Sequence, residues 1–159
     1  MNFSRISFFI LLACMLIFGA SCAMAGGGVG EKASAFSLIS TSGDTVTLND
    51  VLKTGKAVLI FSASWCPYCV EEVPAVNAFY AKKKGSVSVF CVDVNESAAK
   101  AGKFIKDTGM TYPVLLDPNG DAATSYGVKG IPTVIAIDAS GAILYNGHSI
   151  DEMESKVKF

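Results

Sequence analysis

Two cysteines three positions apart are the strongest chemical signal in the sequence. They lie in the stretch Trp65-Cys66-Pro67-Tyr68-Cys69, between a continuous apolar run and a helical pattern. Cysteines at positions i and i+3 share one helical turn and are close enough to form a disulfide. The first turn of a helix has unpaired N–H groups and a positive dipole end, which favour a thiolate over a thiol. Because only the thiolate attacks a disulfide, we expect Cys66 to be the nucleophile of a redox pair.

A structural disulfide, or half of a zinc site, would be the alternative use of this pair. A four-ligand zinc site needs a second pair of ligands. Beyond residue 25 the sequence offers only Cys91 and His148, and their spacing does not match such a site. Pro67 stands at the first helical position, where proline loses no hydrogen bond and presets the turn. We therefore expect redox chemistry at Cys66 and Cys69, with no bound metal and no cofactor.

The composition excludes several classes of protein. Of the 159 residues, 51% are hydrophobic and 17% are charged, which argues against a disordered chain and allows one domain with a proper core. The 13 basic and 14 acidic residues give a net charge of −1, so the chain carries no electrostatic signature of nucleic-acid binding. Five cysteines are too few for a scaffold held together by disulfides. We expect a monomer that does not bind nucleic acid.

The first 25 residues have the layout of a secretory signal peptide. Arg5 precedes the apolar run Ile6–Phe18, and Ala23-Met24-Ala25 provides a cleavage site of the A-x-A type. We expect cleavage after Ala25. The rest of the chain would then be a flexible, glycine-rich leader over residues 26–35 and one folded domain over residues 36–159.

Two alternatives would keep the N-terminus in the membrane. The apolar run could remain as an uncleaved anchor. Cys22 could instead become the lipid-modified first residue of a lipoprotein, although Gly19 stands where such sites usually carry leucine. All three alternatives export the domain, so we expect a periplasmic or otherwise extracytoplasmic protein. Such a compartment is oxidising and permits thiol chemistry.

The elements on either side of the cysteine pair have clear patterns. Residues Lys56–Ser62 contain a continuous apolar run typical of a strand buried on both faces. A helix follows over Cys66–Lys83, and Pro74 inside it is expected to kink it. A second buried strand is expected over Val87–Val94. The cysteine pair therefore belongs at the turn from a central strand into a helix.

The remaining segments suggest a mixed sheet with helices on both faces. The expected elements are a hairpin of Phe36–Leu38 and Val46–Leu48, a short helix capped by Asn49, a helix capped by Asn95 and running to about Asp107, a strand over Tyr112–Leu116, a helix over Asp121–Tyr126, strands over Thr133–Ile137 and Ala142–Tyr145, and a terminal helix over Ile150–Phe159.

Two of these segments resemble parts of a known family. The segment 61–69 resembles the active-site strand, turn and helix of thioredoxins, and 128–133 resembles the thioredoxin segment that holds a cis-proline. The N-terminal hairpin and an insert from about Asn95 to Gly127 resemble the TlpA-like branch of that superfamily. Members of this branch are exported thiol–disulfide oxidoreductases, and several act in cytochrome c maturation.

This resemblance implies a fold and a substrate groove. The fold would be an α/β, thioredoxin-like mixed sheet flanked by helices, with an N-terminal β-hairpin extension and a central insert. The Ile131–Pro132 bond would be cis. Substrate would be bound by Trp65, Pro67, Tyr68, Ile131 and Pro132. For Trp65, simple core packing is the alternative.

The resemblance also implies a role for Glu72. Thioredoxins carry a buried Asp at the position of Ile60, and that Asp helps to move a proton to and from the second cysteine. The exported branch often has a Glu three residues after the second cysteine, and Glu72 stands there. Glu72 is also an i,i+3 neighbour of Cys69 on the helix, so we expect it to accept the proton of Cys69. A solvated helix carboxylate is the alternative, and we expect Glu71 to be plain surface.

The implied reaction is reduction of protein disulfides. Cys66 would attack a substrate disulfide, and Cys69 would then release the reduced substrate and leave the Cys66–Cys69 disulfide. A reductant in an oxidising compartment needs a donor, and the resemblance implies a membrane protein that passes electrons from the cytoplasm.

Two other functions stay open. The dipeptide Pro67-Tyr68 resembles glutaredoxins more than thioredoxins, which leaves a disulfide-donating oxidase possible. A copper chaperone is the binding alternative, although related chaperones use a C-x3-C pair with a distant histidine. Metal titration of the reduced protein would separate that alternative from the enzymes. We expect Cys91 to be a small buried hydrophobic residue and His148 to lie in a surface loop.

The signal pattern generates the first testable prediction. We predict that the exported protein begins at Gly26, because signal peptidase cleaves after an A-x-A site. N-terminal sequencing and intact mass of the exported protein measure this start. A lipid-modified start at Cys22 would contradict it and indicate a lipoprotein instead.

Overall fold

The computed structural model describes residues 26–158. The predicted signal peptide, residues 1–25, lies outside the described residues. Among the helices of the described part, none is long and apolar enough to span a membrane.

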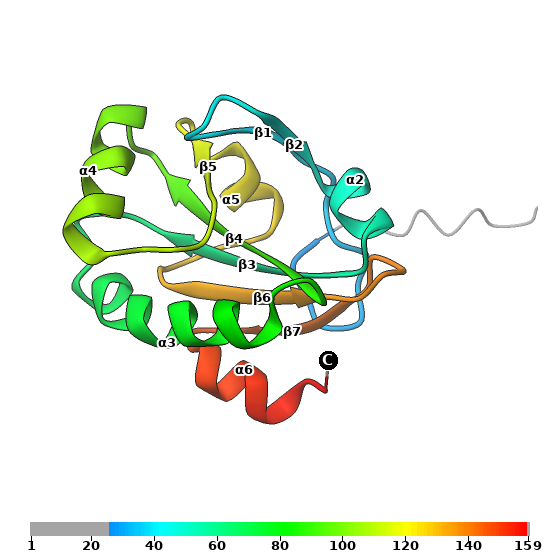
Figure 1. Ribbon diagram of the computed structural model, residues 1–159. Coiled ribbons are helices and arrows are strands. Elements are labelled where there is room, and N and C mark those ends of the chain that lie inside the picture. Colours follow the sequence, from blue (N-terminus) through cyan, green and yellow to red (C-terminus); the bar gives the residue numbers. More distant parts are fainter. Residues whose placement is uncertain (1–25, 159) are drawn as a thin grey trace, which may run out of the picture.

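The fold is built on a seven-stranded mixed sheet with the order β2-β1-β5-β4-β3-β6-β7 (Figure 1). Strands β3, β4 and β5 run parallel in its centre, and the remaining pairs are antiparallel. The strands are β1 (Ser37–Ser40), β2 (Thr45–Thr47), β3 (Lys56–Ser62), β4 (Val87–Val94), β5 (Val114–Asp117), β6 (Thr133–Ile137) and β7 (Ile143–Gly147). The expected hairpin is β1–β2, at one edge of the sheet, and the expected insert contributes β5.

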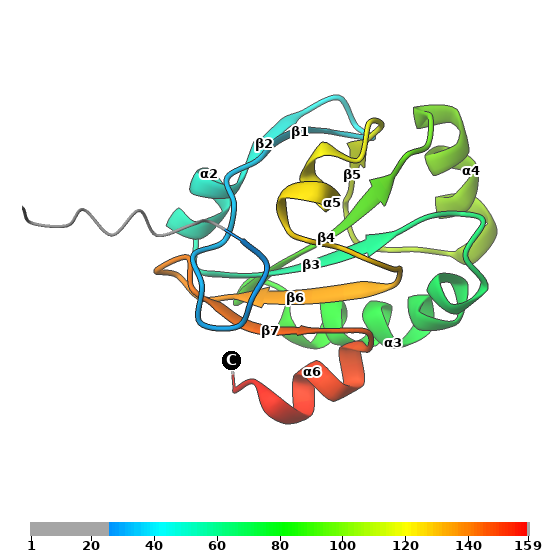
Figure 2. The ribbon, with the colours of Figure 1, turned by 180° about the vertical axis from the view of Figure 1, so that it is seen from behind.

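In the described part of the chain, five helices cover the two faces of this sheet. They are α2 (Leu48–Lys53), α3 (Pro67–Lys83), α4 (Ala98–Thr108), α5 (Asp121–Ser125) and α6 (Ile150–Lys156). Helices α3, α4 and α6 pack on one face and contribute to one apolar cluster, and α2 and α5 pack on the other (Figures 1 and 2). The expected architecture of a mixed sheet flanked by helices is confirmed.

Strand β3 is central because both of its faces are apolar. Val58 and Ile60 point into the cluster under α3, whereas Leu59 and Phe61 point into the opposite cluster. Burial of such side chains contributes about 25 cal/mol per Å² of apolar surface removed from water. A strand with this pattern is most stable in the middle of the sheet, and its last residue then lies close to the start of α3.

Helix α3 packs on the sheet through Val73, Val76 and Phe79, which are all buried. The helix continues without interruption past Pro74. The kink expected at that proline stays a prediction.

The helix after β4 begins later than the sequence suggested. We expected Asn95 to cap it, but the helix begins at Ala98, and the side chain of Ser97 accepts the N–H of Lys100. Asn95 instead has a φ of 57°, a left-handed conformation that asparagine adopts more readily than most residues. Its backbone N–H donates to the carbonyl of Asp117. Asn95 therefore ends the strand, and the prediction of its capping role was wrong.

Several other boundaries differ by a few residues. Thr47, not Asn49, caps α2, because its hydroxyl accepts the N–H of Asp50 at 3.1 Å. Strand β5 begins at Val114 rather than Tyr112, and α6 ends at Lys156. Local patterns rarely fix the ends of elements, since capping and pairing partners decide them.

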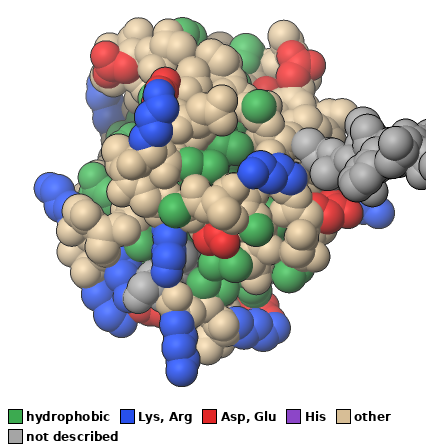
Figure 3. Space-filling model, turned by 90° about the vertical axis from the view of Figure 1, so that its right-hand side faces the viewer, with side chains coloured by type: hydrophobic (Ala, Val, Ile, Leu, Met, Phe, Trp, Pro, Cys, Tyr) green, Lys and Arg blue, Asp and Glu red, His purple; other side chains and the backbone are tan. Residues whose placement is uncertain are grey.

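The segment expected to be a flexible leader makes regular backbone contacts. The N–H of Gly30 donates to the carbonyl of Ile143 at 2.8 Å, and the N–H of Ile143 donates to the carbonyl of Glu31 at 2.9 Å. The segment thus runs beside the ends of β6 and β7 (Figure 2). Whether it is flexible stays a prediction. On the face seen in Figure 3, lysines, acidic residues and hydrophobic side chains are interspersed.

Tyr126 links this N-terminal part to the core and generates a prediction on stability. Its side chain is fully buried, and its hydroxyl donates to the carbonyl of Ser34 at 2.7 Å. Tyr126→Phe leaves that carbonyl without its donor, so we predict a loss of about 1–2 kcal/mol in the free energy of unfolding. Urea denaturation measures it, with Tyr68→Phe at an exposed tyrosine as the control. Equal stability of the two variants would contradict this role.

Candidate active site

The cysteine pair forms a disulfide at the first turn of α3. The Cα atoms of Cys66 and Cys69 are 5.2 Å apart. Cys66 is the N-cap residue, and its Sγ accepts the backbone N–H of Cys69 at 3.2 Å. In the reduced protein the same N–H and the helix dipole would stabilise a thiolate at Cys66. The sequence prediction that the pair begins a helix is confirmed, with Pro67 at the first helical position.

Both sulfur-bearing residues are nearly inaccessible in this oxidised state. Cys66 is 4% exposed and Cys69 is 2% exposed. The helix start is therefore less open at Cys66 than its N-cap position suggests. By contrast, the flanking aromatic residues are largely exposed, with Trp65 at 67% and Tyr68 at 70%. Trp65 is not a core residue, and exposed aromatic side chains beside a reactive pair are typical of a docking surface.

The proline loop lies directly against Cys66. The Ile131–Pro132 bond is cis, as predicted, and the carbonyl oxygen of Ile131 is 3.5 Å from the Sγ of Cys66. Sheet register explains this proximity. Thr133, the first residue of β6, pairs with Phe61 near the end of β3, so the loop before β6 meets the segment between β3 and α3.

Two grooves flank the pair, and Ile131 lines both. One groove, of about 340 Å³, is lined by Tyr68, Glu71, Glu72, Ile131, Pro132 and His148. The other, of about 450 Å³, includes Trp65, Asn95, Asn119, Val128, Lys129 and Ile131. All five residues expected to bind substrate lie at the pair or in these grooves, and Tyr68 and Trp65 line different grooves.

Glu72 lies in the first groove and contacts the C-terminal helix. Its Oε2 accepts the backbone N–H of Ile150 at 3.0 Å, at the first residue of α6. The carboxylate thus satisfies one of the unpaired N–H groups of that helix. Glu72 lines the same groove as Pro132, whereas Trp65 lines the other groove. The proposed proton transfer from Cys69 to Glu72 stays a prediction.

His148 belongs to the site, although its sequence context gave no sign of this. The side chain is exposed, as expected of a loop residue, and its Nδ1 donates to the carbonyl of Pro132 at 2.7 Å. His148 lines the same groove and holds the proline loop in place through this hydrogen bond. Only the pairing of β7 with β6 brings the two residues together, and no local motif encodes it.

Glu96 is a second residue of the site that sequence reasoning missed. It is buried, and its two carboxylate oxygens accept the backbone N–H of Ser64 at 2.5 Å and the Ser64 hydroxyl at 2.7 Å. Ser64 lies two residues before Cys66. Glu96 therefore holds the segment between β3 and α3 against the loop after β4.

The third cysteine of the described part is separate from this chemistry. Cys91 is a free thiol, fully buried on β4. Burial, with a smaller contribution from the charge of Asp93, raises the pKa of the Cys91 thiol well above its usual range. Cys91 is thus the small buried residue that we expected. Among the described residues, no three His, Cys, Asp or Glu side chains are grouped so that they could hold a metal ion.

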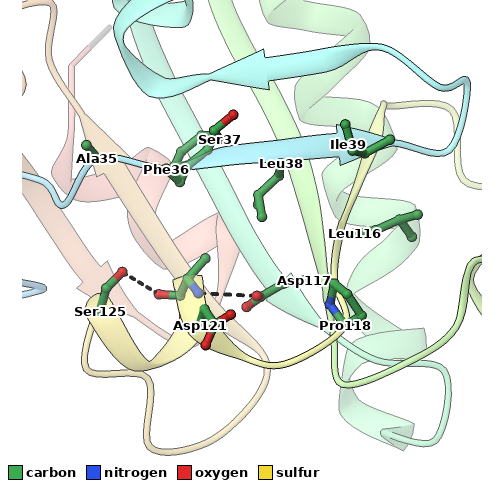
Figure 4. Close-up of a pocket in the computed structure, with 11 residues that line it drawn as sticks. Ala35, Phe36, Ser37, Leu38, Ile39, Leu116, Asp117, Pro118, Asp121 and Ser125 are labelled. Atoms are coloured by element: carbon green, nitrogen blue, oxygen red, sulfur yellow. Dashed lines mark hydrogen bonds between the residues drawn. The ribbon is translucent and has the colours of Figure 1, made fainter.

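A larger groove of about 630 Å³ lies between β1 and α5 and shares no residue with the two active-site grooves. Its buried carboxylate, Asp117, accepts the N–H of Ala122 at 3.2 Å (Figure 4) and that of Ala123 at 2.9 Å, and so caps α5. The contacts of Asp117 are structural.

The fold and the site together define a thiol–disulfide oxidoreductase of the thioredoxin type. A disulfide at a helix start, next to a cis-proline loop, is the arrangement that this class uses. The Redoxin family profile matches residues 28–158, and the chain belongs to the Redoxin family.

Relatives point to the same class. The thiol-disulfide oxidoreductase ResA of Bacillus thuringiensis subsp. konkukian is 30% identical over 118 residues, which are 73% of this chain and 67% of ResA. ResA of Geobacillus kaustophilus is 32% identical over 117 residues, 72% of this chain and 66% of that protein. These matches support the expected TlpA-like branch, which includes ResA-like proteins.

Solved structures share the fold. A candidate protein disulfide isomerase from Bacteroides thetaiotaomicron has a TM-score of 0.74 and 32% identity, covering 83% of this chain and 89% of that chain. A Chlorobium tepidum protein described as a thiol:disulfide interchange protein DsbE has a TM-score of 0.72 and 33% identity, covering 80% of this chain and 92% of its own. The expected thioredoxin-like fold and enzyme class are therefore confirmed.

The contact between Cys66 and the helix start generates a prediction on reactivity. In the reduced protein at mildly acidic pH, iodoacetamide should alkylate Cys66 faster than Cys69, because only Cys66 has its sulfur at the N-cap. Cys91 should react only after unfolding, since it is fully buried. Peptide mass mapping over a time course measures the three rates. Faster alkylation of Cys69 would reverse the roles of the two residues.

Proposed function

We propose that this protein is an exported thiol–disulfide oxidoreductase that reduces disulfides of envelope proteins. The observation that carries the proposal is the Cys66–Cys69 disulfide at the start of α3, with the Ile131 carbonyl 3.5 Å from the Cys66 Sγ. A helix start supplies a stabilised thiolate, and the adjacent loop supplies backbone groups that an extended peptide can pair with.

The reaction has two exchanges. The Cys66 thiolate attacks one sulfur of a substrate disulfide, forms a mixed disulfide and releases the other substrate sulfur as a thiolate. The Cys69 thiol loses its proton and attacks the Cys66 sulfur of the mixed disulfide. The second substrate sulfur then leaves as a thiolate. Two electrons have passed to the substrate, and the Cys66–Cys69 disulfide remains.

Substrate docking in this proposal uses the exposed aromatic residues and the proline loop. An extended peptide would lie across the Ile131–Pro132 segment, with side chains in the grooves beside Tyr68 and Trp65. Aromatic side chains offer large apolar contact areas at low entropic cost. His148 and Glu96 act indirectly, by holding the proline loop and the segment before Cys66.

The cellular setting is part of the proposal. The signal-peptide pattern supports export to an extracytoplasmic compartment, with the anchored forms as alternatives. A reductant there needs continuous supply of electrons, and a membrane protein that carries them from the cytoplasm fits that need. Cytochrome c maturation, with apocytochrome thiols as substrate, is one role that the TlpA-like resemblance suggests. We propose a monomer.

Trapping tests the function directly. The Cys69→Ala variant should form mixed disulfides through Cys66 that are not released, because the resolving thiol is absent. The variant is expressed with its own leader, and trapped envelope proteins are identified by mass spectrometry after non-reducing electrophoresis. Cys66→Ala, which keeps the other thiol, is the matched control. Equal trapping by both variants would contradict the assigned roles.

The direction of electron flow has its own measurement. Equilibration of the Cys66–Cys69 pair against glutathione buffers should give a reducing potential, near the thioredoxin value of about −270 mV. A potential near the oxidising value of about −120 mV typical of a dedicated oxidase would reverse the direction and favour the disulfide-donating alternative.

Glu72 generates a kinetic prediction. If its carboxylate accepts the Cys69 proton, Glu72→Gln should leave the first attack by Cys66 unchanged and slow release of the mixed disulfide about tenfold. The amide oxygen of glutamine can still accept the N–H of Ile150, so the fold should be retained. Stopped-flow single turnovers with an aromatic disulfide separate the two steps. Glu71→Gln is the matched control. Equal release rates in the two variants would contradict proton acceptance by Glu72 and leave it with only its structural contact to Ile150.

A further inference from the structure

Asp93 is an unexplained carboxyl group in the core. Its side chain is fully buried at the end of β4, and neither carboxylate oxygen has a hydrogen-bond partner among the described residues. Buried polar groups without partners are rare because each one loses its hydration without compensation. A purely structural carboxyl group would be expected to cap a helix, as the buried Asp117 does.

The side-chain alternation of the sheet places Asp93 on the α3 face. On β4, Val89 and Cys91 belong to the apolar cluster under α3, whereas Val92 belongs to the opposite cluster. Asp93 is two residues beyond Cys91 and therefore points to the same side as Cys91. Its register partner on β3 is Ser62. Ser62 is two residues after Ile60 and so points to the same face of the sheet as Ile60.

Helix α3 packs over this face of β3 and β4 and runs in the direction opposite to the two strands. Val73 packs in the same cluster as Ile60 and Cys91. Cys69 is one helical turn before Val73 and is also buried. Cys69 lies in the first turn of α3 and comes soon after the end of β3. Ser62, the register partner of Asp93, is the last residue of β3. Cys69 and Asp93 therefore lie on the same face of the sheet, at the end where the disulfide lies.

Glu96 adds a second carboxylate to this region. Three residues after Asp93 it accepts two hydrogen bonds from Ser64, in the segment that leads to Cys66. Burial raises the pKa of Asp93 most, and the negative charge and the close approach of the Glu96 carboxyl group raise it further, to about 7. Near neutral pH this carboxyl group can therefore exist in both its charged and its neutral form.

We propose that Asp93 exchanges a proton with the thiol of Cys69 during release of the mixed disulfide, alongside the route through the outer groove offered by Glu72. This role rests on the proposed function, because it concerns the second exchange of that reaction. The buried face of α3 is closed by the sheet, so a group inside the core is best placed to take a proton from the inner side of Cys69.

The proposed step balances without a further reactant. The Asp93 carboxylate takes the proton from the Cys69 Sγ, directly or through one water, as Cys69 attacks the Cys66 sulfur of the mixed disulfide. The Cys69–Cys66 bond forms and the bond from Cys66 to the substrate sulfur breaks. The substrate leaves as a thiolate, and Asp93 becomes a neutral carboxylic acid. When the dithiol is regenerated, Asp93 returns the proton to Cys69.

The other ionisable groups around Asp93 are few. Cys91 lies on the same strand and Glu96 in the loop that follows. Cys66 and Cys69 come from α3, and Tyr112, before β5, lies near Cys91. Burial raises the pKa values of Cys91 and Tyr112 above their usual ranges, so neither takes a proton from Cys69 at neutral pH. From α4, Lys100 and Lys103 line an outer groove with Ser64.

The test is the pH profile of release in single turnovers. Reduced protein is mixed with dithiobis-nitrobenzoate, whose coloured thiolate appears once on attack by Cys66 and again on release. In the wild-type protein, release should accelerate as pH rises through about 7, because only ionised Asp93 accepts a proton. Asp93→Asn should lose this step and release about tenfold more slowly at pH 7. Its profile should then follow the ionisation of a thiol at about pH 8.5 or above.

Two further variants make the test specific. Glu96→Gln removes the charge that raises the Asp93 pKa, so its profile should shift to lower pH, opposite to Asp93→Asn. Asp44→Asn, which removes one exposed negative charge from the turn between β1 and β2, should keep the wild-type profile. An unchanged profile in Asp93→Asn would overturn the inference. If Asp93→Asn does not fold, an unshifted profile in Glu96→Gln would overturn it instead. A wild-type protein that shows no attack phase would contradict the proposed function itself.

Discussion

The backbone N–H of Cys69 donates to the Sγ of Cys66 at 3.2 Å, and the chemistry of the protein depends on this short contact. It exists because α3 begins at Pro67, one residue after Cys66. A sulfur at the N-cap faces the unpaired N–H groups and the positive end of the helix dipole. The second sulfur, one turn further, faces the core. The two thiols thus have different environments, which supports the proposed roles of Cys66 in attack and Cys69 in release.

The sheet determines what surrounds this contact. Pairing of β3 with β6 brings the cis-proline loop to 3.5 Å from the Cys66 Sγ, and His148 and Glu96 hold the two segments that meet there. Carboxyl groups lie on both sides of α3. Glu72 is in the outer groove and Asp93 is inside the core. The position usually given to a buried Asp in thioredoxins is occupied by Ile60, and a buried carboxyl group on that face, Asp93, comes instead from the neighbouring strand β4.

Local sequence was enough for the parts of the site that are themselves local. The cysteine pair, the helix start and the buried strand before it each lie within a few consecutive residues and were predicted from them. The cis-proline was predicted from the resemblance of residues 128–133 to thioredoxins. The contacts of Glu72 with Ile150 and of His148 with Pro132 join residues 78 and 16 positions apart. In the sequence, Asp93 is one polar residue in an apolar strand. Its significance depends on the sheet register and on its lack of a hydrogen-bond partner among the described residues. The prediction that Asn95 caps a helix was wrong because asparagine is common both at helix N-caps and in left-handed turns.

The central claim is that the start of α3 makes Cys66 a stabilised thiolate that reduces disulfides. The most direct measurement is a titration of the thiolate ultraviolet absorbance in the reduced protein, with Cys69→Ala to isolate Cys66. The account predicts a Cys66 pKa clearly below the free-cysteine value of about 8.5, as at other helix N-termini. A pKa at or above that value would contradict the account, because the helix start would then contribute nothing to the nucleophile.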